Sequence, residues 1–200
     1  YLDHNATSPL RAGAREAMVA ALRAMGNASS VHGEGRAARK LLDDSRETIA
    51  RAAGAMAPMV TFTSGGSEAN NLALKGAAVE RLIVSAIEHP SVLAGGRFAK
   101  AELVPVMPSG VVDVAALRGM LAAPGRSLVS IMLANNETGV VQDVAALAEK
   151  AKAARAWFHA DAVQALGKIK VDFAALNVHA MTLSAHKIYG PKGVGALVLD

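Results

Sequence analysis

Short apolar runs alternate with helical segments over most of this chain. Seven runs of four to six residues are largely apolar: Met59–Thr63, Leu82–Ala86, Glu102–Val106, Leu128–Leu133, Ala156–His159, Ala180–Leu183 and Gly195–Leu199. Between most of them lie segments rich in Ala and Leu at helical spacing, such as Glu68–Val79, Val114–Leu121 and Val144–Ala154. Strands that are apolar on both faces and alternate with helices predict an α/β domain around a mostly parallel sheet.

The first part of the chain lacks this alternation. The polar residues within Tyr1–Pro9 predict an extended arm with a turn. Apolar residues at helical spacing predict a helix over Arg11–Met25, ended by Gly26. A second helix is predicted over Arg36–Gly54, where alternating basic and acidic residues are typical of a solvated face. We find no internal repeat and no low-complexity linker.

Composition narrows the classes of function. The chain has 200 residues, of which 52% are hydrophobic and 19% charged, enough to bury one core. Its 21 basic residues exceed its 17 acidic ones but are scattered, and aromatic residues make up 4%, so nucleic-acid binding is not supported. The absence of cysteine excludes disulfides, thiolate metal sites and thiol nucleophiles within these residues.

The longest apolar runs and the two ends of the chain suggest where the protein is located and whether the sequence is part of a longer one. No run reaches membrane-spanning length, and the start lacks the pattern of a signal peptide, so we expect a cytoplasmic protein. The chain begins with Tyr1 rather than Met and stops on the strand-like Gly195–Asp200. We therefore expect that one or both ends belong to a longer protein.

Polar clusters follow five of the predicted strands. These clusters are Ser64–Glu68, Glu88–Pro90, Asn135–Gly139, Asp161 with Gln164, and Ser184–Lys187. In an open parallel sheet, ligands bind outside the carboxyl ends of the strands. The clusters are therefore predicted to converge on one crevice.

The cluster Ser64–Ser67 precedes a predicted helix. Gly65 and Gly66 have no Cβ, so backbone N–H groups can approach an anion at the start of this helix. The segment is interpreted as a phosphate cup, although it lacks the spacing of a P-loop. Ordinary capping of the helix by Ser67 is the alternative.

Three further clusters each leave two interpretations open. Asp161 ends a hydrophobic strand, so its carboxylate needs either the donors of a helix N-terminus or a cation such as a protonated heteroaromatic nitrogen. His89, held extended by Pro90, can stack on an aromatic ligand or serve as a cap. The amides of Asn135–Gly139 form a turn or donate to a carboxylate or phenolate.

Lys187 discriminates between these alternatives. An unperturbed lysine amine has a pKa of about 10.4, and partial burial beside other cations lowers it, so the neutral amine can attack a carbonyl. The alternative is a strand-end charge that reaches solvent. A phosphate cup, a buried Asp161, a stacking ring and a reactive amine together describe a site for pyridoxal 5'-phosphate with no metal.

The quoted clusters make the chain resemble the cysteine desulfurases of the class-V aminotransferase family, in the branch of iron–sulfur-cluster and nitrogen-fixation enzymes. The resemblance spans the chain and rests on an ordered series of stretches: Tyr1–Thr7, Ser29–His32, Phe62–Asn71, Glu88–Pro90, Asn135–Gly139, Asp161–Gln164 and Ser184–Gly193. An ordered series of this kind is far more specific than any one of its members.

The resemblance implies a role for each candidate residue. Lys187 would form a Schiff base with pyridoxal phosphate, Asp161 would pair with its pyridine nitrogen, and His89 would stack on its ring. Gln164 and Asn136 would lie near the phenolic oxygen and the substrate carboxylate. The residues that would hold the phosphate are Gly66, Ser67, Ser184 and His186.

The resemblance also implies fold, partners and activity. It implies the large domain of the type I fold of pyridoxal-phosphate enzymes, with residues 1–14 as an arm of the small domain and 15–200 as an incomplete cofactor domain. It implies a homodimer with a site at the subunit interface. The reaction would convert L-cysteine to L-alanine and leave a persulfide, which passes to an iron–sulfur scaffold or another acceptor protein.

The chain departs from the family in several places. The family's persulfide cysteine, its substrate-binding arginine and a phosphate contact from the partner subunit lie beyond Asp200, so the 200 residues alone are not expected to sustain turnover. Ser67 stands where threonine is common, and His179 where an acidic residue is common. Alternatives are a selenocysteine lyase, an aminotransferase, or an inactive fragment that binds cofactor or dimerises.

Overall fold

The structure is a computed structural model that describes residues 1–200. Seven strands form one sheet in the order β1-β7-β6-β5-β4-β2-β3. Their bounds are β1 Val60–Thr63, β2 Arg81–Ser85, β3 Glu102–Val104, β4 Ser127–Ser130, β5 Trp157–Asp161, β6 Ala180–Ser184 and β7 Gly195–Leu199. Strands β3, β2, β4, β5 and β6 pair in parallel, and β7 is antiparallel to both β6 and β1. The predicted α/β domain with a mostly parallel, mixed sheet is confirmed.

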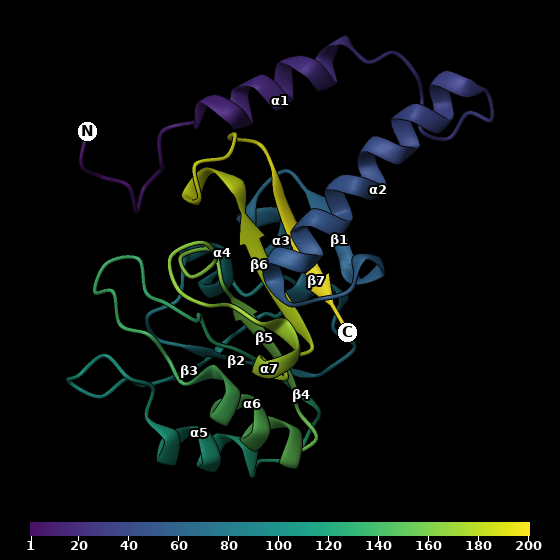
Figure 1. Ribbon diagram of the computed structural model, residues 1–200. Coiled ribbons are helices and arrows are strands. Elements are labelled where there is room, and N and C mark those ends of the chain that lie inside the picture. Colours follow the sequence, from purple (N-terminus) through teal and green to yellow (C-terminus); the bar gives the residue numbers. More distant parts are fainter.

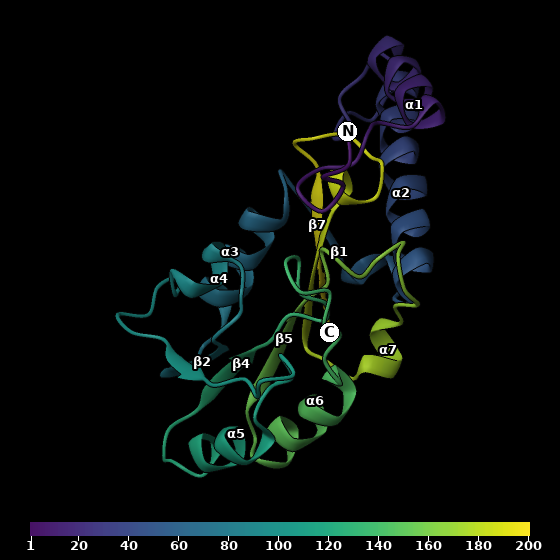
Figure 2. The same ribbon diagram turned by 90° about the vertical axis from the view of Figure 1, so that its left-hand side faces the viewer.

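Helices cover both faces of the sheet (Figures 1 and 2). Figure 2 shows α3 (Gly66–Gly76) and α4 (Pro90–Leu93) on one side. The helices on the other side are α2 (Gly33–Ala53), α5 (Val114–Leu121), α6 (Val144–Ala153) and α7 (Phe173–Leu176). Two short 3-10 turns, η1 (Ala57–Met59) and η2 (Ala185–Lys187), precede β1 and follow β6.

The period-two alternation of β5 sends its side chains to two different environments. Phe158 and Ala160 belong to the large core of 28 buried residues on the side of α2, α5, α6 and α7. His159 and Asp161 point the other way, toward α3 and α4, and both are buried. The same pleat that fills the core therefore places a carboxylate beneath helix α3.

Most predicted elements have slightly different bounds in the structure, and α1, α2 and β4 are three examples. Helix α1 spans Ala12–Arg23 and ends at Ala24 rather than at Gly26. Helix α2 begins at Gly33, earlier than predicted, because the His32 side chain accepts a hydrogen bond from the Gly35 amide. Strand β4 ends at Ser130 rather than Leu133, since residues 131–133 leave β2 while still bonding to carbonyls of β5.

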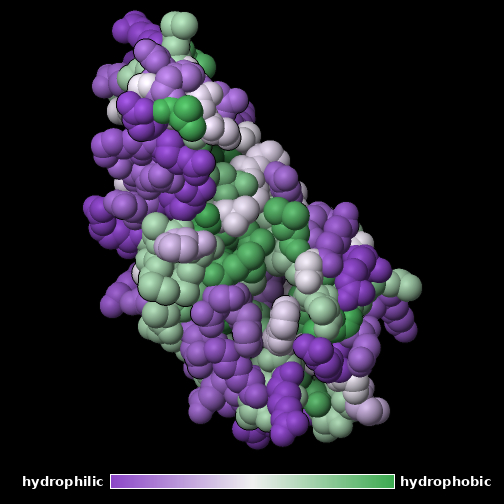
Figure 3. Space-filling view, turned by 90° about the vertical axis from the view of Figure 1, so that its right-hand side faces the viewer, coloured by the Kyte–Doolittle hydropathy of each residue, from purple (hydrophilic) through white to green (hydrophobic).

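Helix α1 and the N-terminal half of α2 project from the body of the molecule (Figures 1 and 2). Helix α1 buries none of its residues. The face seen in Figure 3 is largely hydrophilic over this projection, with hydrophobic patches on the body below. None of the helices combines the length and the apolar character needed to cross a membrane.

Candidate active site

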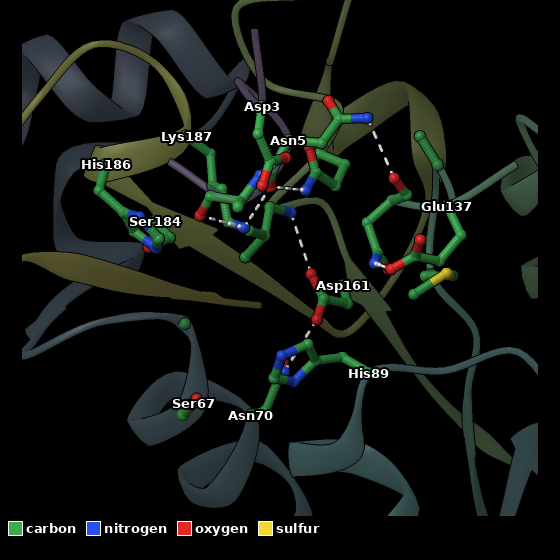
Figure 4. Close-up of a pocket in the computed structure, with 17 residues that line it drawn as sticks. Asp3, Asn5, Ser67, Asn70, His89, Glu137, Asp161, Ser184, His186 and Lys187 are labelled. Atoms are coloured by element: carbon green, nitrogen blue, oxygen red, sulfur yellow. Dashed lines mark hydrogen bonds between the residues drawn. The ribbon is translucent and has the colours of Figure 1, made fainter. Parts of the chain in front are cut away.

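The strand ends meet at one cavity of about 600 Å³, shown in Figure 4. Its walls come from the N-terminal arm, the start of α3, the start of α4 and the segments that follow β4, β5 and β6. All nine residues predicted for the site line it: Gly66, Ser67, His89, Asn136, Asp161, Gln164, Ser184, His186 and Lys187. The structure therefore brings the predicted set together, while the role of each residue stays a prediction.

Lys187 lies on η2, directly after β6, and its amine points into the cavity (Figure 4). Its Nζ donates to the main-chain oxygens of Asn5 at 2.5 Å and Ala6 at 2.9 Å. Burial lowers the pKa of Lys187, and the charge of Lys168 lowers it further, against Asp161, which raises it. A half-buried amine held inside a cavity is not a solvated surface charge.

Asp161 is buried at the end of β5, with 5% of its surface exposed. One carboxylate oxygen accepts from the Val163 amide at 3.0 Å, and the other accepts from Asn70 Nδ2 at 2.8 Å. Burial raises the pKa of Asp161, while these two donors and the charges of His89 and Lys187 oppose that rise. A buried carboxyl in this state is stabilised as the anion by any cation that comes to lie beside it.

His89 both caps helix α4 and lines the cavity. Its Nδ1 accepts from the Ser91 amide at 3.1 Å and lies 2.7 Å from Ser91 Oγ. The cap therefore occupies Nδ1 and not Nε2, while the His89 side chain lines the cavity (Figure 4). The two interpretations of His89 given by the sequence are compatible in the structure.

Asn70 is a site residue that the sequence reasoning missed. Its Nδ2 donates to Asp161 Oδ2 and, at 2.9 Å, to Ser91 Oγ, so it links the carboxylate to the cap of His89. Asn70 is 1% exposed and lies next to Ala69 on the buried face of α3. An amide on the apolar face of a helix was the signal available in the sequence.

The wall of the cavity at the start of α3 is rich in backbone N–H groups. Gly65 caps the helix with φ 157° and ψ −179°, a conformation that side chains disfavour. The N–H groups of the first helical turn have no partners within the helix. Ser67 does not cap the helix through its side chain; instead Glu68 Oε2 accepts from the Ser64 amide at 2.5 Å. The capping interpretation of Ser67 is therefore wrong.

Two more donors face this part of the cavity. The Ser184 hydroxyl is buried and has no hydrogen-bond partner within the protein. His186 Nδ1 lies 3.1 Å from Thr7 Oγ1, and its pKa is lowered by burial and by the charges of Lys187 and Lys192. A second cavity of about 500 Å³ continues from here, lined by Ser64–Glu68 and Lys192. Amide, hydroxyl and ammonium donors of this kind suit a phosphate group.

The amides of Gln164 and Asn136 meet the N-terminal arm. Gln164 Nε2 donates to the main-chain oxygen of Asn5 at 2.8 Å. Asn5 Nδ2 in turn donates to the main-chain oxygen of Asn136 at 3.0 Å. Neighbouring Asn135 is buried and accepts from the amides of Glu137 and Thr138, so it shapes the turn that presents Asn136. Asn5 was quoted only as part of the arm, and its contacts could not be read from spacing.

Glu88 is buried immediately before His89. Its Oε1 accepts from Ser85 Oγ at 2.5 Å and from the Met132 amide at 2.7 Å, which ties the end of β2 to the segment after β4. Burial raises the pKa of Glu88 to about 8. This carboxyl supports the wall of the cavity without lining it.

The residues of the cavity fit pyridoxal phosphate. The buried Ser184 hydroxyl without a partner and the first turn of α3 match its phosphate, and the buried Asp161 matches a protonated ring nitrogen. Lys187 supplies an amine whose pKa is lowered. The fit rests on three separate features of the cavity rather than on one motif.

Comparisons with known proteins agree with this geometry. The family model of the class-V aminotransferases matches residues 1–200. The cysteine desulfurase IscS of Dictyoglomus turgidum is 42% identical, covering 100% of this chain and 53% of that protein. The IscS-like cysteine desulfurase of Mycobacterium tuberculosis is 40% identical, covering 100% of this chain and 55% of that protein.

Solved structures give the same result. A NifS-like protein from Rickettsia africae superposes with a TM-score of 0.94 at 37% identity, covering 100% of this chain and 57% of that one. SspA in complex with cysteine superposes with a TM-score of 0.90 at 34% identity, covering 100% and 60%. The chain spans about half the length of the curated relatives that it matches. Since the family model extends over every strand and every wall of the cavity, the chain belongs to the class-V aminotransferase family.

Proposed function

We propose that the protein containing this chain is a pyridoxal-phosphate-dependent cysteine desulfurase, which converts L-cysteine to L-alanine and passes on the sulfur. The observation that carries the proposal is the presence of Lys187 and the buried Asp161 in one cavity, beside a helix start suited to phosphate. The names of the relatives support the choice of reaction, and one similar structure is a complex with cysteine.

Each residue has a role that follows from its environment. Lys187 would hold the cofactor through Nζ, because its lowered pKa increases the fraction of the amine that is neutral and able to react. Asp161 holds the ring nitrogen in its protonated form, as a buried anion beside a cation. When bound, the cofactor supplies an electron-withdrawing ring that stabilises negative charge on the substrate.

His89 and Lys187 are the groups that can move protons in this cavity. The cap of α4 occupies His89 Nδ1, so Nε2 is the ring atom that exchanges a proton with the substrate. Lys187 Nζ exchanges a proton whenever it is not bound to the cofactor. The amides of Gln164 and Asn136 orient the phenolic oxygen of the cofactor and the substrate carboxylate.

The phosphate is held by Gly66, Ser67, Ser184 and His186 in the same proposal. The start of α3 offers N–H groups and a positive helix end, and the Ser184 hydroxyl gains the partner that the protein itself does not provide. No residue among these 200 can carry the persulfide, since the chain has no cysteine. The proposal therefore places the persulfide cysteine outside this chain.

Further parts of the proposal concern assembly and location. The protein is a homodimer that delivers sulfur to an iron–sulfur scaffold or another acceptor protein in the cytoplasm. The division into an arm at 1–14 and a cofactor domain at 15–200 stays a prediction of the same kind. Sedimentation of the cofactor-loaded protein tests the dimer directly.

The reaction is tested with the protein that contains this chain. Incubation with pyridoxal phosphate, L-cysteine and a reducing thiol should release alanine and sulfide in equal amounts. The Lys187→Ala variant should lose both products and the visible absorbance of the bound cofactor. A matched control is Lys75→Ala, which removes an exposed lysine at the end of α3. Cofactor bound through Lys187 without either product would overturn the proposal.

Alternative substrates separate the related reactions. A protein that releases alanine only from selenocysteine is a selenocysteine lyase, and one that transfers the amino group to a keto acid is an aminotransferase. The isolated 200 residues should bind pyridoxal phosphate without turnover. A preparation of these residues that folds but binds no cofactor would favour an inactive fragment that serves only for dimerisation.

A further inference from the structure

A second lysine lies beside the Lys187 amine. Lys168 follows β5, and its Nζ donates to Gln164 Oε1 at 2.5 Å and to Asn5 Oδ1 at 3.1 Å. Lys187 Nζ donates to the main-chain oxygen of the same Asn5 at 2.5 Å. Two lysine amines therefore contact one residue of the arm, and nothing in the function proposed above uses the second of them.

Lys168 determines which end of the Gln164 amide faces the arm. A lysine ammonium has only hydrogen-bond donors, so its partner in the Gln164 amide must be the oxygen, which accepts. With Oε1 held by Lys168, Nε2 is directed at the main-chain oxygen of Asn5, 2.8 Å away. Gln164 is 9% exposed and lines the cavity, so few other groups compete for its amide. Lys168 therefore makes Gln164 a donor on its cavity side.

Lys168 also acts on Lys187 through its charge. Its ammonium is partly sheltered by Gln164 and the arm, and burial lowers its own pKa. Like charges at short range disfavour one another, so Lys168 favours the neutral form of the Lys187 amine. After burial, Lys168 is the largest cause of the lowered pKa of Lys187.

Other titratable groups face the same amine from the surrounding elements. Asp161 at the end of β5 and Asp3 of the arm both act to raise the pKa of Lys187. The remaining titratable side chains around the cavity are His89 on the α4 side, Glu137 after β4 and His186 on η2. Lys168 is the one neighbouring side chain whose charge lowers the pKa of this amine.

We propose that Lys168 is a positioning residue of this site, which directs the Gln164 amide nitrogen toward the arm and holds a like charge beside the Lys187 amine. The proposal rests on the proposed function in one respect only: it is there that the neutral Lys187 amine binds the cofactor. The contacts themselves involve neither cofactor nor substrate, so they can be tested without either.

The test is the acetylation rate of Lys187 as a function of pH in cofactor-free protein. The protein is pulsed with acetic anhydride at low salt, and the peptide that contains Lys187 is quantified by mass spectrometry. In Lys168→Met, this rate near neutral pH should fall about two- to fivefold, the range expected for one partly exposed charge. In Lys168→Met, the profile of acetylation rate against pH should move to higher pH. In Lys168→Arg, which keeps the charge, the profile should match that of the wild type.

Salt and a neighbouring lysine serve as controls. At about 1 M salt the Debye length is about 3 Å, so the difference between wild type and Lys168→Met should shrink. A difference caused by a displaced segment would persist. Lys170→Met removes an exposed lysine two positions away and should leave the profile unchanged. A Lys168→Met profile that coincides with wild type at low salt overturns the charge part of the proposal.

The amide part has its own readout. The side-chain NH2 resonances of Gln164 are assigned in ¹⁵N-labelled protein by their loss in Gln164→Leu. Hydrogen exchange of this NH2 group should accelerate severalfold in Lys168→Met, because the amide is no longer held at Oε1. Unchanged exchange overturns the positioning role. Neither result depends on desulfurase activity, so failure here is distinct from failure of the proposed function.

Discussion

Asn70 of helix α3 donates to the carboxylate of Asp161 at the end of β5, with Nδ2 and Oδ2 2.8 Å apart. The same nitrogen donates to Ser91 Oγ, and Ser91 in turn contacts the ring of His89. The proposed partner of the ring nitrogen and the proposed stacking residue are therefore positioned by one amide. Helix α3 thus contributes to the site at its middle as well as at its N-terminus.

Replacement of Asn70 should weaken cofactor binding. Asn70→Ala removes a donor from a buried carboxylate, which costs about 1–3 kcal/mol, so affinity for pyridoxal phosphate should fall about five- to 150-fold. Equilibrium binding followed by fluorescence measures the change. Asn71→Ala is the matched control, because that amide bonds only to the main chain of its own helix, at Ser67. Equal affinities for the two variants would contradict the role given to Asn70.

Replacement of Ser184 should separate stability from binding. Its hydroxyl is buried without a partner, so Ser184→Ala should leave the free energy of unfolding of the cofactor-free protein unchanged or raise it by about 1 kcal/mol. Affinity for pyridoxal phosphate should fall about five- to thirtyfold, since a hydrogen bond to a charged phosphate is lost. Urea denaturation and equilibrium binding measure the two quantities.

The control is to compare the effect of Ser184→Ala on the binding of ligands with and without the phosphate. Affinity for pyridoxal, which lacks the phosphate, should be equal in wild type and Ser184→Ala. Ser109→Ala, in an exposed turn, should change neither stability nor binding. An equal loss of affinity for pyridoxal and its phosphate would show that Ser184 does not act on the phosphate.

A methyl group at position 66 should obstruct the start of α3. A Cβ on Gly66 would lie 2.9 Å from Val163 Cγ2 and 3.5 Å from Ser184 Cβ, so Gly66→Ala forces a shift in the phosphate pocket. We expect a loss of about 1–3 kcal/mol in stability and a weaker affinity for pyridoxal phosphate. Thermal unfolding and binding measure both.

A second substitution tests whether the contact with Val163 causes the effect of Gly66→Ala. The double variant Gly66→Ala with Val163→Ala relieves the closest contact and should recover much of the lost affinity. Gly76→Ala is the matched control at the other end of α3, where an added Cβ meets nothing within 4 Å. This control should stabilise the protein by about 0.5–1 kcal/mol, as expected for glycine to alanine in a helix. Failure of the double variant to recover affinity would point to a cause other than crowding by Val163.

Glu88 should make stability fall with rising pH. Its pKa is raised from 4.5 to about 8 in the folded protein by burial. Between these two values the unfolded chain has lost the proton while the folded protein keeps it, so the contribution of Glu88 is full below pH 4.5 and is lost by about pH 8. The slope from this one group is at most about 1.4 kcal/mol per pH unit.

The variant Glu88→Gln isolates this effect. Glutamine keeps the acceptor for Ser85 and Met132 but has no proton to lose, so its stability relative to wild type should grow from about pH 5 to about pH 8. Urea denaturation across this range measures the difference. Glu149→Gln, in helix α6, is the control at a glutamate outside the cavity wall. A constant difference between Glu88→Gln and wild type across the range would show that Glu88 titrates normally.

The order of the elements and nine of the 17 residues that line the cavity were accessible from the sequence. Apolar runs predict buried strands because strand geometry is local, and the carboxyl ends of parallel strands meet at one edge of the sheet whatever lies between them. This is why Asp161, Ser184 and Lys187 could be assigned to a common crevice. The start of α2 differed from the prediction because a local hydrogen bond, to the His32 side chain, decided it.

The tertiary structure alone decided the partners of these residues. Asn5 lies 182 positions before Lys187 and still accepts from its amine, and Asn70 lies 91 positions before Asp161. Such contacts depend on strand order, on the antiparallel insertion of β7 between β1 and β6, and on the packing of α3 over the sheet. The sequence by itself determined which chemical groups gather at the strand ends, because that follows from short-range pattern. Which group donates to which was determined by packing between distant segments, because a hydrogen bond requires positions accurate to a fraction of an ångström.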